Sequence, residues 1–302
     1  MHFQCSKLIN RIFVDSLTNV RSMVKQNQVV KLVATDLDGT FLRNDKSISN
    51  DNLKSLHALG ERGILRVIAT GRNLKKTLDV IPEYVPFDYI VFSSGAGVYD
   101  RRNDRLLFHQ NLSAEITQAL ADFLIANDLN FHLFKPVPHN YMCWYHRGSI
   151  LCQEFENYFT YLQAHSEPLP ISGPINSEAC QFLVVFPNDL DRFMKLKNGI
   201  ESKFEDVKVV RTSSPLESGY IWMEIFHQSV SKGNGVRFLC DSLQIDHKHT
   251  VGIGNDYNDL DLLEFTNHSY LVANGPDELK MRFLPAKSNE ESAFASIVEN
   301  YL

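Results

Sequence analysis

The stretch Val29-Val30-Lys31-Leu32-Val33-Ala34-Thr35-Asp36-Leu37-Asp38-Gly39-Thr40 decides the fold, because an apolar run ends directly in two carboxylates. The run predicts a buried strand. Asp36 and Asp38 are two residues apart, so they should project together from its carboxyl end, the usual ligand edge of an open parallel sheet. Their like charges repel each other, and Mg²⁺, which favours hard oxygen ligands, would relieve the repulsion. The glycine and threonine that follow favour a tight turn.

Three further motifs stand at the end of an apolar run or at the start of a helical pattern. Residues 64–69 lead into Thr70-Gly71-Arg72, and residues 250–253 lead into Gly254-Asn255-Asp256-Tyr257-Asn258-Asp259. Between these two runs, Ser231-Lys232-Gly233 opens a helical pattern. All of these polar groups are therefore predicted to lie at strand ends or helix starts.

In this order, the four motifs resemble the signatures of the haloacid dehalogenase superfamily of phosphohydrolases. The sequence is most similar to the Cof-type sugar-phosphate phosphatases, a subgroup with a large α/β cap inserted between the second and third signatures. Residues 94–100 resemble that subgroup's stretch after the third strand, with Ser94 where asparagine is usual, and residues 272–280 resemble its closing segment. The resemblance covers most of the chain from Lys31 onward, but inside the cap it is only one of pattern.

The resemblance implies the catalytic residues. Asp36 would attack phosphorus and form an aspartyl-phosphate, and Asp38 would protonate the leaving oxygen and later activate water. Lys232, near a helix start, would neutralise both Asp36 and the transferring phosphoryl group.

The second motif is expected to bind the substrate's phosphate together with Lys232. Thr70 would offer its hydroxyl and Gly71 its backbone amide to the phosphoryl oxygens, since no Cβ at Gly71 blocks their approach. Arg72 either touches the substrate or braces the loop.

The implied cofactor is Mg²⁺, and its implied ligands are Asp36, Asp38, Asn255 and Asp256. Asn255 departs from the family pattern because a metal-binding aspartate is usual at its place. An amide oxygen can ligate Mg²⁺ but brings no charge, so Asp256 or Asp259 would supply what Asn255 lacks. The residues expected to surround the ligands, or to hold Lys232 and water, are Asn258, Asp259 and Asn274.

Composition bounds the class of protein. The chain has 302 residues, 44% of them hydrophobic and 22% charged, which is ordinary for a globular protein and indicates neither disorder nor a membrane span. The formal net charge of −6 argues against a general nucleic-acid binder, which needs a basic surface. The five cysteines are odd in number and have no Cys-x-x-Cys spacing, so neither a disulfide framework nor a zinc site is indicated, and a reducing cytoplasm fits best.

The pattern of strands and helices predicts an α/β fold, a doubly wound Rossmann-like parallel sheet with an inserted α+β cap. Residues 23–111 and 217–302 are assigned to the hydrolase core, and residues 112–216 to the cap domain. Strand-like residues 221–225 are expected to return the chain to the core sheet. Residues 1–22 are interpreted as a poorly ordered extension, with an organellar presequence as the alternative.

These observations predict a Mg²⁺-dependent phosphatase that acts on a small phosphorylated metabolite. Sugar phosphates come first, with pyridoxal phosphate or flavin mononucleotide behind them. Two alternatives stay open: a phosphomutase or phosphotransferase with the same core residues, and a non-catalytic metabolite-binding protein, which Asn255 motivates. Four cap residues could face the substrate, although packing is the default interpretation: His139, Tyr141, Trp144 and His146.

Overall fold

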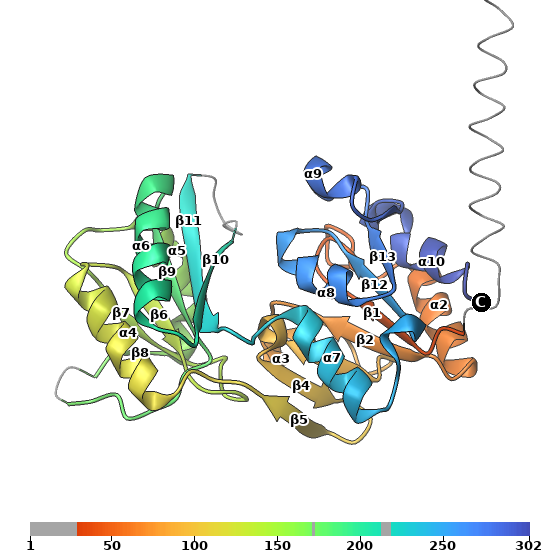
Figure 1. The fold of residues 1–302 in the computed structure, drawn as a ribbon, viewed down its shortest axis with the longest axis horizontal. Coiled ribbons are helices and arrows are strands. Elements are labelled where there is room, and N and C mark those ends of the chain that lie inside the picture. Colours follow the sequence, from red (N-terminus) through yellow and green to blue (C-terminus); the bar gives the residue numbers. More distant parts are fainter. Residues whose placement is uncertain (1–28, 171–172, 213–218) are drawn as a thin grey trace, which may run out of the picture.

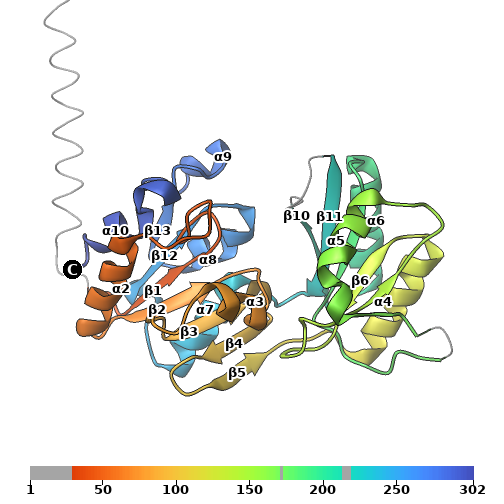
Figure 2. The ribbon, with the colours of Figure 1, turned by 180° about the vertical axis from the view of Figure 1, so that it is seen from behind.

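The computed structural model describes residues 29–170, 173–212 and 219–302, which form two sheets side by side, each with helices on both faces (Figures 1 and 2). We call the eight-stranded sheet with its helices the core, and the six-stranded sheet with its helices the cap. Two connections join core and cap, one after β5 and one after β11 (Figure 1). The predicted extension at residues 1–22 lies outside the described residues.

The core sheet has the strand order β14-β13-β12-β1-β2-β3-β4-β5. Its bounds are β1 Leu32–Thr35, β2 Leu65–Ala69, β3 Tyr89–Phe92, β4 Gly97–Asp100, β5 Arg105–His109, β12 Thr250–Gly254, β13 His268–Leu271 and β14 Leu284–Pro285. All neighbouring pairs from β14 to β3 are parallel, whereas β4 and β5 form an antiparallel edge hairpin. The predicted doubly wound α/β class is thus confirmed.

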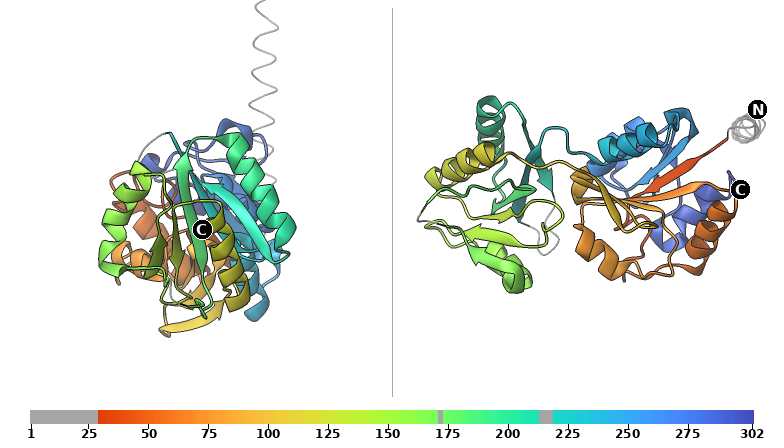
Figure 3. Two further views of the ribbon diagram at one scale, coloured as in Figure 1. Left: turned by 90° about the vertical axis from the view of Figure 1, so that its left-hand side faces the viewer. Right: turned by 90° about the horizontal axis from the view of Figure 1, so that it is seen from below.

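Helices cover both faces of the core sheet (Figure 3, right). One face packs against α2 (Asn50–Glu61), α3 (Leu74–Val80) and α10 (Ala293–Val298), and the other against α7 (Lys232–Ser242) and α8 (Leu260–Phe265). The short α9 (Asp277–Lys280) follows β13. Because both faces are covered, the central strands are apolar throughout: in β1, Val33 packs toward one face while its neighbours pack toward the other.

The cap sheet is antiparallel except for one pair, with the order β10-β11-β9-β6-β7-β8. Its bounds are β6 Phe131–Phe134, β7 Cys143–His146, β8 Ser166–Pro168, β9 Gln181–Pro187, β10 Val207–Thr212 and β11 Tyr220–His227. One face carries α4 (Ala114–Ala126) and α6 (Leu190–Lys203), and α5 (Gln153–Leu162) lies on the opposite face (Figure 3). Alternate residues of each strand therefore belong either to the α4/α6 face or to the α5 face.

The expectation that residues 221–225 return to the core sheet is wrong. Strand β11 pairs with β10 and β9 in the cap sheet, and the chain re-enters the core only at α7. Both faces of β11 are buried, since Ile221, Met223 and Ile225 face α4 and α6 while Trp222 and Phe226 pack on the other side. This largely apolar run, interrupted by Glu224, imitates a buried parallel strand. The core therefore does not begin at residue 217; the rest of the domain division stays a prediction.

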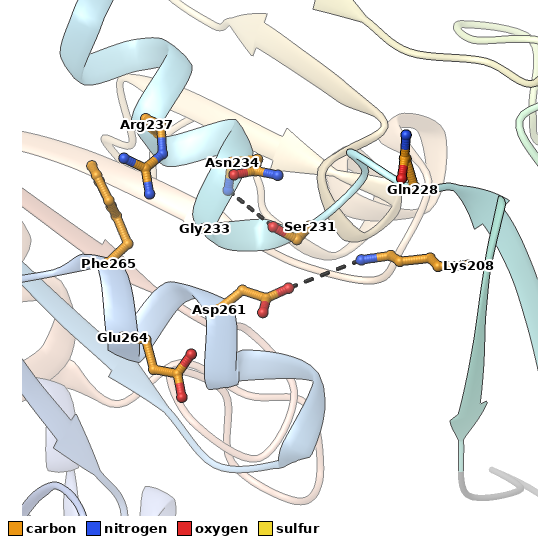
Figure 4. Close-up of a pocket in the computed structure, with 9 residues that line it drawn as sticks. All are labelled: Lys208, Gln228, Ser231, Gly233, Asn234, Arg237, Asp261, Glu264 and Phe265. Carbon is orange, nitrogen blue, oxygen red and sulfur yellow. Dashed lines mark hydrogen bonds and ion pairs between the residues drawn. The ribbon is translucent and has the colours of Figure 1, made fainter. Parts of the chain in front are cut away.

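Direct contacts tie the cap to the core. Asn140 Nδ2 donates to Ser93 Oγ at 2.7 Å. On the other side of the junction, Lys208 Nζ of β10 lies 3.9 Å from Asp261 Oδ2 of α8. Figure 4 shows this ion pair in a cavity of about 370 Å³ beside the start of α7. None of the residues that line this smaller cavity carries one of the predicted catalytic roles.

Candidate active site

A cavity of about 710 Å³ lies between core and cap. The core lines it with loops that follow β1, β2 and β12, because the carboxyl ends of these neighbouring parallel strands meet at one edge. The sequence-predicted residues that line it are Asp36, Asp38, Thr70, Gly71, Arg72, Asn255, Asp256 and Asn258. The structure thus brings together motifs more than 200 residues apart in the sequence.

A buried lysine bridges two buried carboxylates beside this cavity. Lys232 Nζ donates to Asp36 Oδ1 at 2.8 Å and to Asp259 Oδ1 at 2.6 Å. The Lys232 side chain is 1% exposed, and those of Asp36 and Asp259 are 6% and 0% exposed. Water therefore screens this charge pattern very little, and each group depends on the others to stay ionised.

The pKa values follow from this burial. Desolvation raises the pKa of Asp36 to about 7 against the opposing charge of Lys232, and the neighbouring Asp259 raises it further. Burial alone would lower the pKa of Lys232, but Asp259 and Asp36 outweigh it and the net shift is upward. Lys232 therefore stays charged, and a second cation near Asp36 would favour its ionised form.

The start of α7 fixes the position of Lys232. Lys232 is the first residue of the helix, and the Ser231 hydroxyl caps it by accepting from Asn234 N at 3.1 Å. Gly95, with φ +100°, packs against this start, and a Cβ there would collide with the Ser231 carbonyl. The turn after β3 therefore admits only glycine at this close approach.

Both carboxylate oxygens of Asp259 accept hydrogen bonds from neighbouring groups. Its Oδ1 accepts from Lys232, and its Oδ2 accepts from the backbone N–H groups of Asn255 at 2.8 Å and Asp256 at 3.1 Å. It therefore holds the lysine and the loop after β12 in one arrangement. The contact with Lys232 that the sequence predicted is present.

The Asn255 side chain points at the oxygens of the first motif. One end of its amide lies 3.2 Å from Asp36 Oδ2, 3.3 Å from the Asp38 carbonyl oxygen and 3.2 Å from Thr40 Oγ1. With nitrogen at that end, the amide donates to these oxygens; with oxygen there, it joins Asp36 Oδ2 and the Asp38 carbonyl in a convergent set of hard oxygen atoms. Such a donor set fits a small divalent cation such as Mg²⁺.

The Asp38 carboxylate does not take part in this oxygen set, contrary to expectation. It accepts from Arg72 Nε at 2.6 Å and Nη2 at 2.8 Å, and from Lys46 Nζ at 2.9 Å. Burial raises the Asp38 pKa, but these two cations outweigh burial and bring it to about 2. Only the backbone carbonyl of Asp38 faces the Asn255 amide, because the first motif leaves the strand at Thr35 and turns. Arg72 braces the loop through Asp38 and also lines the cavity, so both alternatives for it stay predictions.

The Asp256 carboxylate is not among the oxygens that converge on the Asn255 amide, and its role as a metal ligand stays a prediction. Asp256 lines the cavity, but its Oδ1 accepts from Tyr257 N at 2.7 Å and caps the short 3₁₀ turn Tyr257–Asp259. Across the described residues, no group of three or more His, Cys, Asp or Glu side chains is arranged to hold a metal ion. The candidate cation ligands are instead one carboxylate, one amide and one backbone carbonyl.

The remaining predicted residues have modest contacts. Thr70 is buried at the end of β2, and its Oγ1 accepts from Arg72 N at 3.2 Å, which leaves the hydroxyl proton for another acceptor. Asn274 Nδ2 donates to the Gly39 carbonyl at 2.8 Å and so supports the turn after Asp38. Asn258 lies on the cavity wall.

Sequence reasoning predicted none of the described cap residues that line the cavity as site residues. They are Phe134, Asn140, Tyr158, Gln181, Leu183, Thr212, Trp222 and Glu224. They come from four strands, one helix and one loop, with no shared spacing that could have marked them. The four cap residues considered from the sequence are not among the residues that line this cavity in the described chain. Lys46 and Lys76 were missed on the core side.

Two further findings bear on the class of protein. Cys143, Cys152, Cys180 and Cys240 are free and buried, whereas Cys5 lies outside the described residues. Within the described ranges, none of the helices combines the length and apolar character needed to cross a membrane.

Known proteins resemble this chain along most of its length. The phosphatase YwtE of Bacillus subtilis, named for 5-amino-6-(5-phospho-D-ribitylamino)uracil, is 28% identical over 292 residues, which cover 90% of this chain and 98% of that protein. The HMP-PP phosphatase of Serratia proteamaculans is 24% identical over 83% of this chain and 86% of its own length. Among solved structures, the phosphatase BT1666 of Bacteroides thetaiotaomicron has a TM-score of 0.76 at 16% identity, over 92% of this chain and 97% of that one.

A model of the haloacid dehalogenase-like hydrolases matches residues 33–296, which include all four motifs and the whole cap. A HAD/COF-like hydrolase from Plasmodium vivax shares the fold, with a TM-score of 0.72 at 19% identity over 93% of this chain and 98% of that one. The chain belongs to the haloacid dehalogenase-like hydrolases of the Cof type and is a phosphoric monoester hydrolase.

Proposed function

We propose that this protein is a Mg²⁺-dependent phosphatase that hydrolyses a small phosphorylated metabolite, a sugar phosphate first, through an aspartyl-phosphate on Asp36. One observation carries the proposal. Asp36 lines the cavity. Lys232 binds its Oδ1, and its Oδ2 faces the Asn255 amide. A carboxylate oxygen held in this way can approach an anionic phosphoryl group because positive charge is already beside it.

The names of the relatives support a small phosphorylated substrate. The relative from Bacillus subtilis is named for a phosphorylated ribityl compound, and the one from Serratia proteamaculans is an HMP-PP phosphatase. A cavity of about 710 Å³ between core and cap accommodates molecules of this size.

In the proposed reaction, Asp36 Oδ2 forms a bond to phosphorus as the bond between phosphorus and the ester oxygen breaks. Asp38 gives a proton to the departing oxygen. In the second half, Asp38 takes a proton from water, whose oxygen attacks phosphorus and releases inorganic phosphate and the Asp36 carboxylate. Thr70 and Gly71 bind the phosphoryl oxygens from the loop after β2.

Mg²⁺ would be held by Asp36, the Asp38 carbonyl and Asn255, and it would supply positive charge to the phosphoryl oxygens. Asn255 brings no charge, so the protein contributes one carboxylate to this set. We therefore expect the Asn255→Asp variant to bind Mg²⁺ more tightly than the wild-type protein.

The pairing of Asp38 with Arg72 and Lys46 suggests how the acid is controlled. With a pKa of about 2, Asp38 holds no proton near neutral pH. An arriving phosphoryl group carries negative charge that competes for Arg72 and Lys46. Once these cations turn to the phosphate, the pKa of Asp38 rises and the residue can carry the proton that the leaving oxygen needs.

The test is phosphate release by the purified protein from a panel of phosphorylated metabolites, with Mg²⁺ and with EDTA in its place. We expect Mg²⁺-dependent release that Asp36→Asn abolishes and that Asp51→Asn, an exposed carboxylate in α2, leaves unchanged. Transfer of phosphate to an added polyol during one turnover, without free phosphate, would indicate the phosphotransferase alternative. Binding of a metabolite without turnover by the folded protein, with affinity unchanged in Asp36→Asn, would indicate the alternative of a non-catalytic metabolite-binding protein.

A further inference from the structure

The cap wall of the cavity brings three polar groups together by strand register. Thr212 in β10 stands opposite Trp222 in β11, and Glu224 stands opposite Leu183 in β9. These residues occupy the positions that alternate with the α4/α6 hydrophobic cluster, so they belong to the other face of the sheet. Asn140, in the loop between β6 and β7, lines the same cavity.

The Asn140 amide has an unused oxygen. Its Nδ2 donates to Ser93 Oγ at 2.7 Å and to Cys180 Sγ at 3.3 Å. The residue is 3% exposed, and Oδ1 has no hydrogen-bond partner among the described residues. A buried carbonyl oxygen without a donor is unfavourable, so a donor is expected to reach it in the working state.

Thr212 and Glu224 share this lack of partners. Thr212 Oγ1 is buried without a hydrogen bond to any residue that the structure describes. Glu224 forms no hydrogen bond or ion pair within the same residues, and it is the only acidic residue on the cap wall of the cavity there. Burial raises the pKa of Glu224 to about 7, against the lowering by the charge of Lys232.

Positive charge on the cavity wall comes from the core. The described residues that line the cavity include three cations, all on core loops or α3: Lys46, Arg72 and Lys76. The described cap residues on the wall include no Lys, Arg or His. A phosphate at the Asp36 end thus meets cations, whereas a second anionic group at the cap end would meet the carboxylate of Glu224. Of the three cations, Lys76 comes nearest to the cap wall, with Nζ 5.8 Å from the centroid of the Tyr158 ring.

The same wall offers an aromatic surface. Tyr158 of α5 and Trp222 of β11 pack edge to face with ring centroids 4.6 Å apart, and Trp222 Nε1 is already bound to Glu154 at 3.1 Å. Such rings suit the apolar face of a sugar or of a planar heterocycle.

We propose that Asn140, Thr212 and Glu224 select phosphomonoesters whose leaving group is uncharged and rich in hydroxyl or N–H donors, and exclude esters with a second anionic group. The inference rests on the proposed function, since it concerns the leaving group at the same site. Each of the three accepts a hydrogen bond from the leaving group, and Glu224 adds repulsion of anions. The chemical class is a phosphorylated polyol or sugar, with room for an attached ring.

The test compares kcat/KM for sorbitol 6-phosphate, fructose 1,6-bisphosphate, 3-phosphoglycerate and acetyl phosphate. Acetyl phosphate has no hydroxyl donor and reports on the core chemistry alone. We expect kcat/KM for sorbitol 6-phosphate to exceed that for fructose 1,6-bisphosphate and for 3-phosphoglycerate, which carry a second anionic group, at least tenfold. Glu224→Gln should reduce that preference at least tenfold, because it removes the negative charge that repels the second anion.

Matched variants make the result specific. Glu205→Gln removes an exposed cap carboxylate outside the cavity and should change no ratio, while Thr212→Val removes one acceptor at nearly constant size. Thermal unfolding of each variant checks that the fold persists. Equal activity on the polyol phosphate and the bisphosphate, or an unchanged ratio in Glu224→Gln with acetyl phosphate still hydrolysed, would overturn this inference. Failure to hydrolyse any of the four phosphorylated compounds, acetyl phosphate included, would overturn the proposed function instead.

Discussion

The core and the cap face one cavity with opposite kinds of polar surface. In the core, charged groups are paired before any ligand arrives: Lys232 with Asp36 and Asp259, and Arg72 with Asp38. In the cap, the polar groups on the cavity wall include acceptors without donors. The paired charges of the core hold the reacting groups in place before a ligand arrives, whereas the unpaired acceptors of the cap gain their hydrogen bonds only from a ligand with matching donors. The core is thus suited to one reaction and the cap to choosing its substrate.

The largest effect is expected at the core nucleophile. Asp36→Asn should lower kcat by at least about 10⁴-fold, because an amide cannot form the covalent bond to phosphorus. Ligand binding should persist, since the amide keeps the size of the side chain. Asp51→Asn is the control for loss of one carboxylate. Steady-state kinetics together with calorimetric binding would separate the two readouts, and substantial turnover by Asp36→Asn would contradict the proposal.

The next effect concerns the buried bridge. Lys232→Met leaves the buried carboxylates of Asp36 and Asp259 facing each other without a cation, which should cost about 3–5 kcal/mol in the free energy of unfolding. Activity should fall together with stability. Denaturant unfolding measures the cost, and the exposed Lys54→Met is the control. Adding Asp259→Asn to Lys232→Met should restore part of the stability but not the activity; full stability in Lys232→Met alone would refute the paired-charge description.

A smaller effect distinguishes the cap. The pKa of Glu224 is about 7 in the folded protein and near 4.5 when unperturbed. Between these values the folded protein holds a proton that the unfolded chain has lost, so stability falls as pH rises through this interval. Glu224→Gln should therefore match the wild type below about pH 4.5 and be more stable above pH 7, by roughly 1–3 kcal/mol. Unfolding curves of both proteins across pH 4 to 8 measure the difference, and parallel curves would rule out a buried unpaired carboxyl.

The smallest effect is expected from a single neutral acceptor. Thr212→Val should raise KM for a polyol phosphate about 2- to 10-fold, the worth of one hydrogen bond of about 0.5–1.5 kcal/mol. The acetyl phosphate reaction serves as the internal reference, because acetyl phosphate has no hydroxyl group to offer. A larger change in kcat than in KM would place Thr212 in the chemistry rather than in substrate choice.

The two regions also differ in how well the sequence predicts them. The core site follows from strand periodicity, because Asp36, Thr70 and Asn255 each come directly after an apolar run, and parallel strands end at one edge. The conformations of individual side chains could not be predicted from the sequence. The Asp38 carboxylate turns to Arg72 and Lys46, and its carbonyl takes the place expected of the side chain.

The cap resisted prediction for a different reason. Its strand β11 was placed in the wrong sheet because both of its faces are buried. The acceptors on its wall come from different elements and share no spacing, so only the strand register of β10 with β11 and the loop after β6 bring them together.

The most direct test of the central claim is to trap the covalent step on Asp36. The protein, turning over an accepted substrate with Mg²⁺, is quenched rapidly in acid and treated with borohydride, which reduces an aspartyl-phosphate to homoserine. Mass spectrometry of the tryptic peptide 32–43 then reads the result. The account predicts homoserine at position 36 in this peptide and unmodified Asp38. Turnover with position 36 unmodified at every quench time would contradict it.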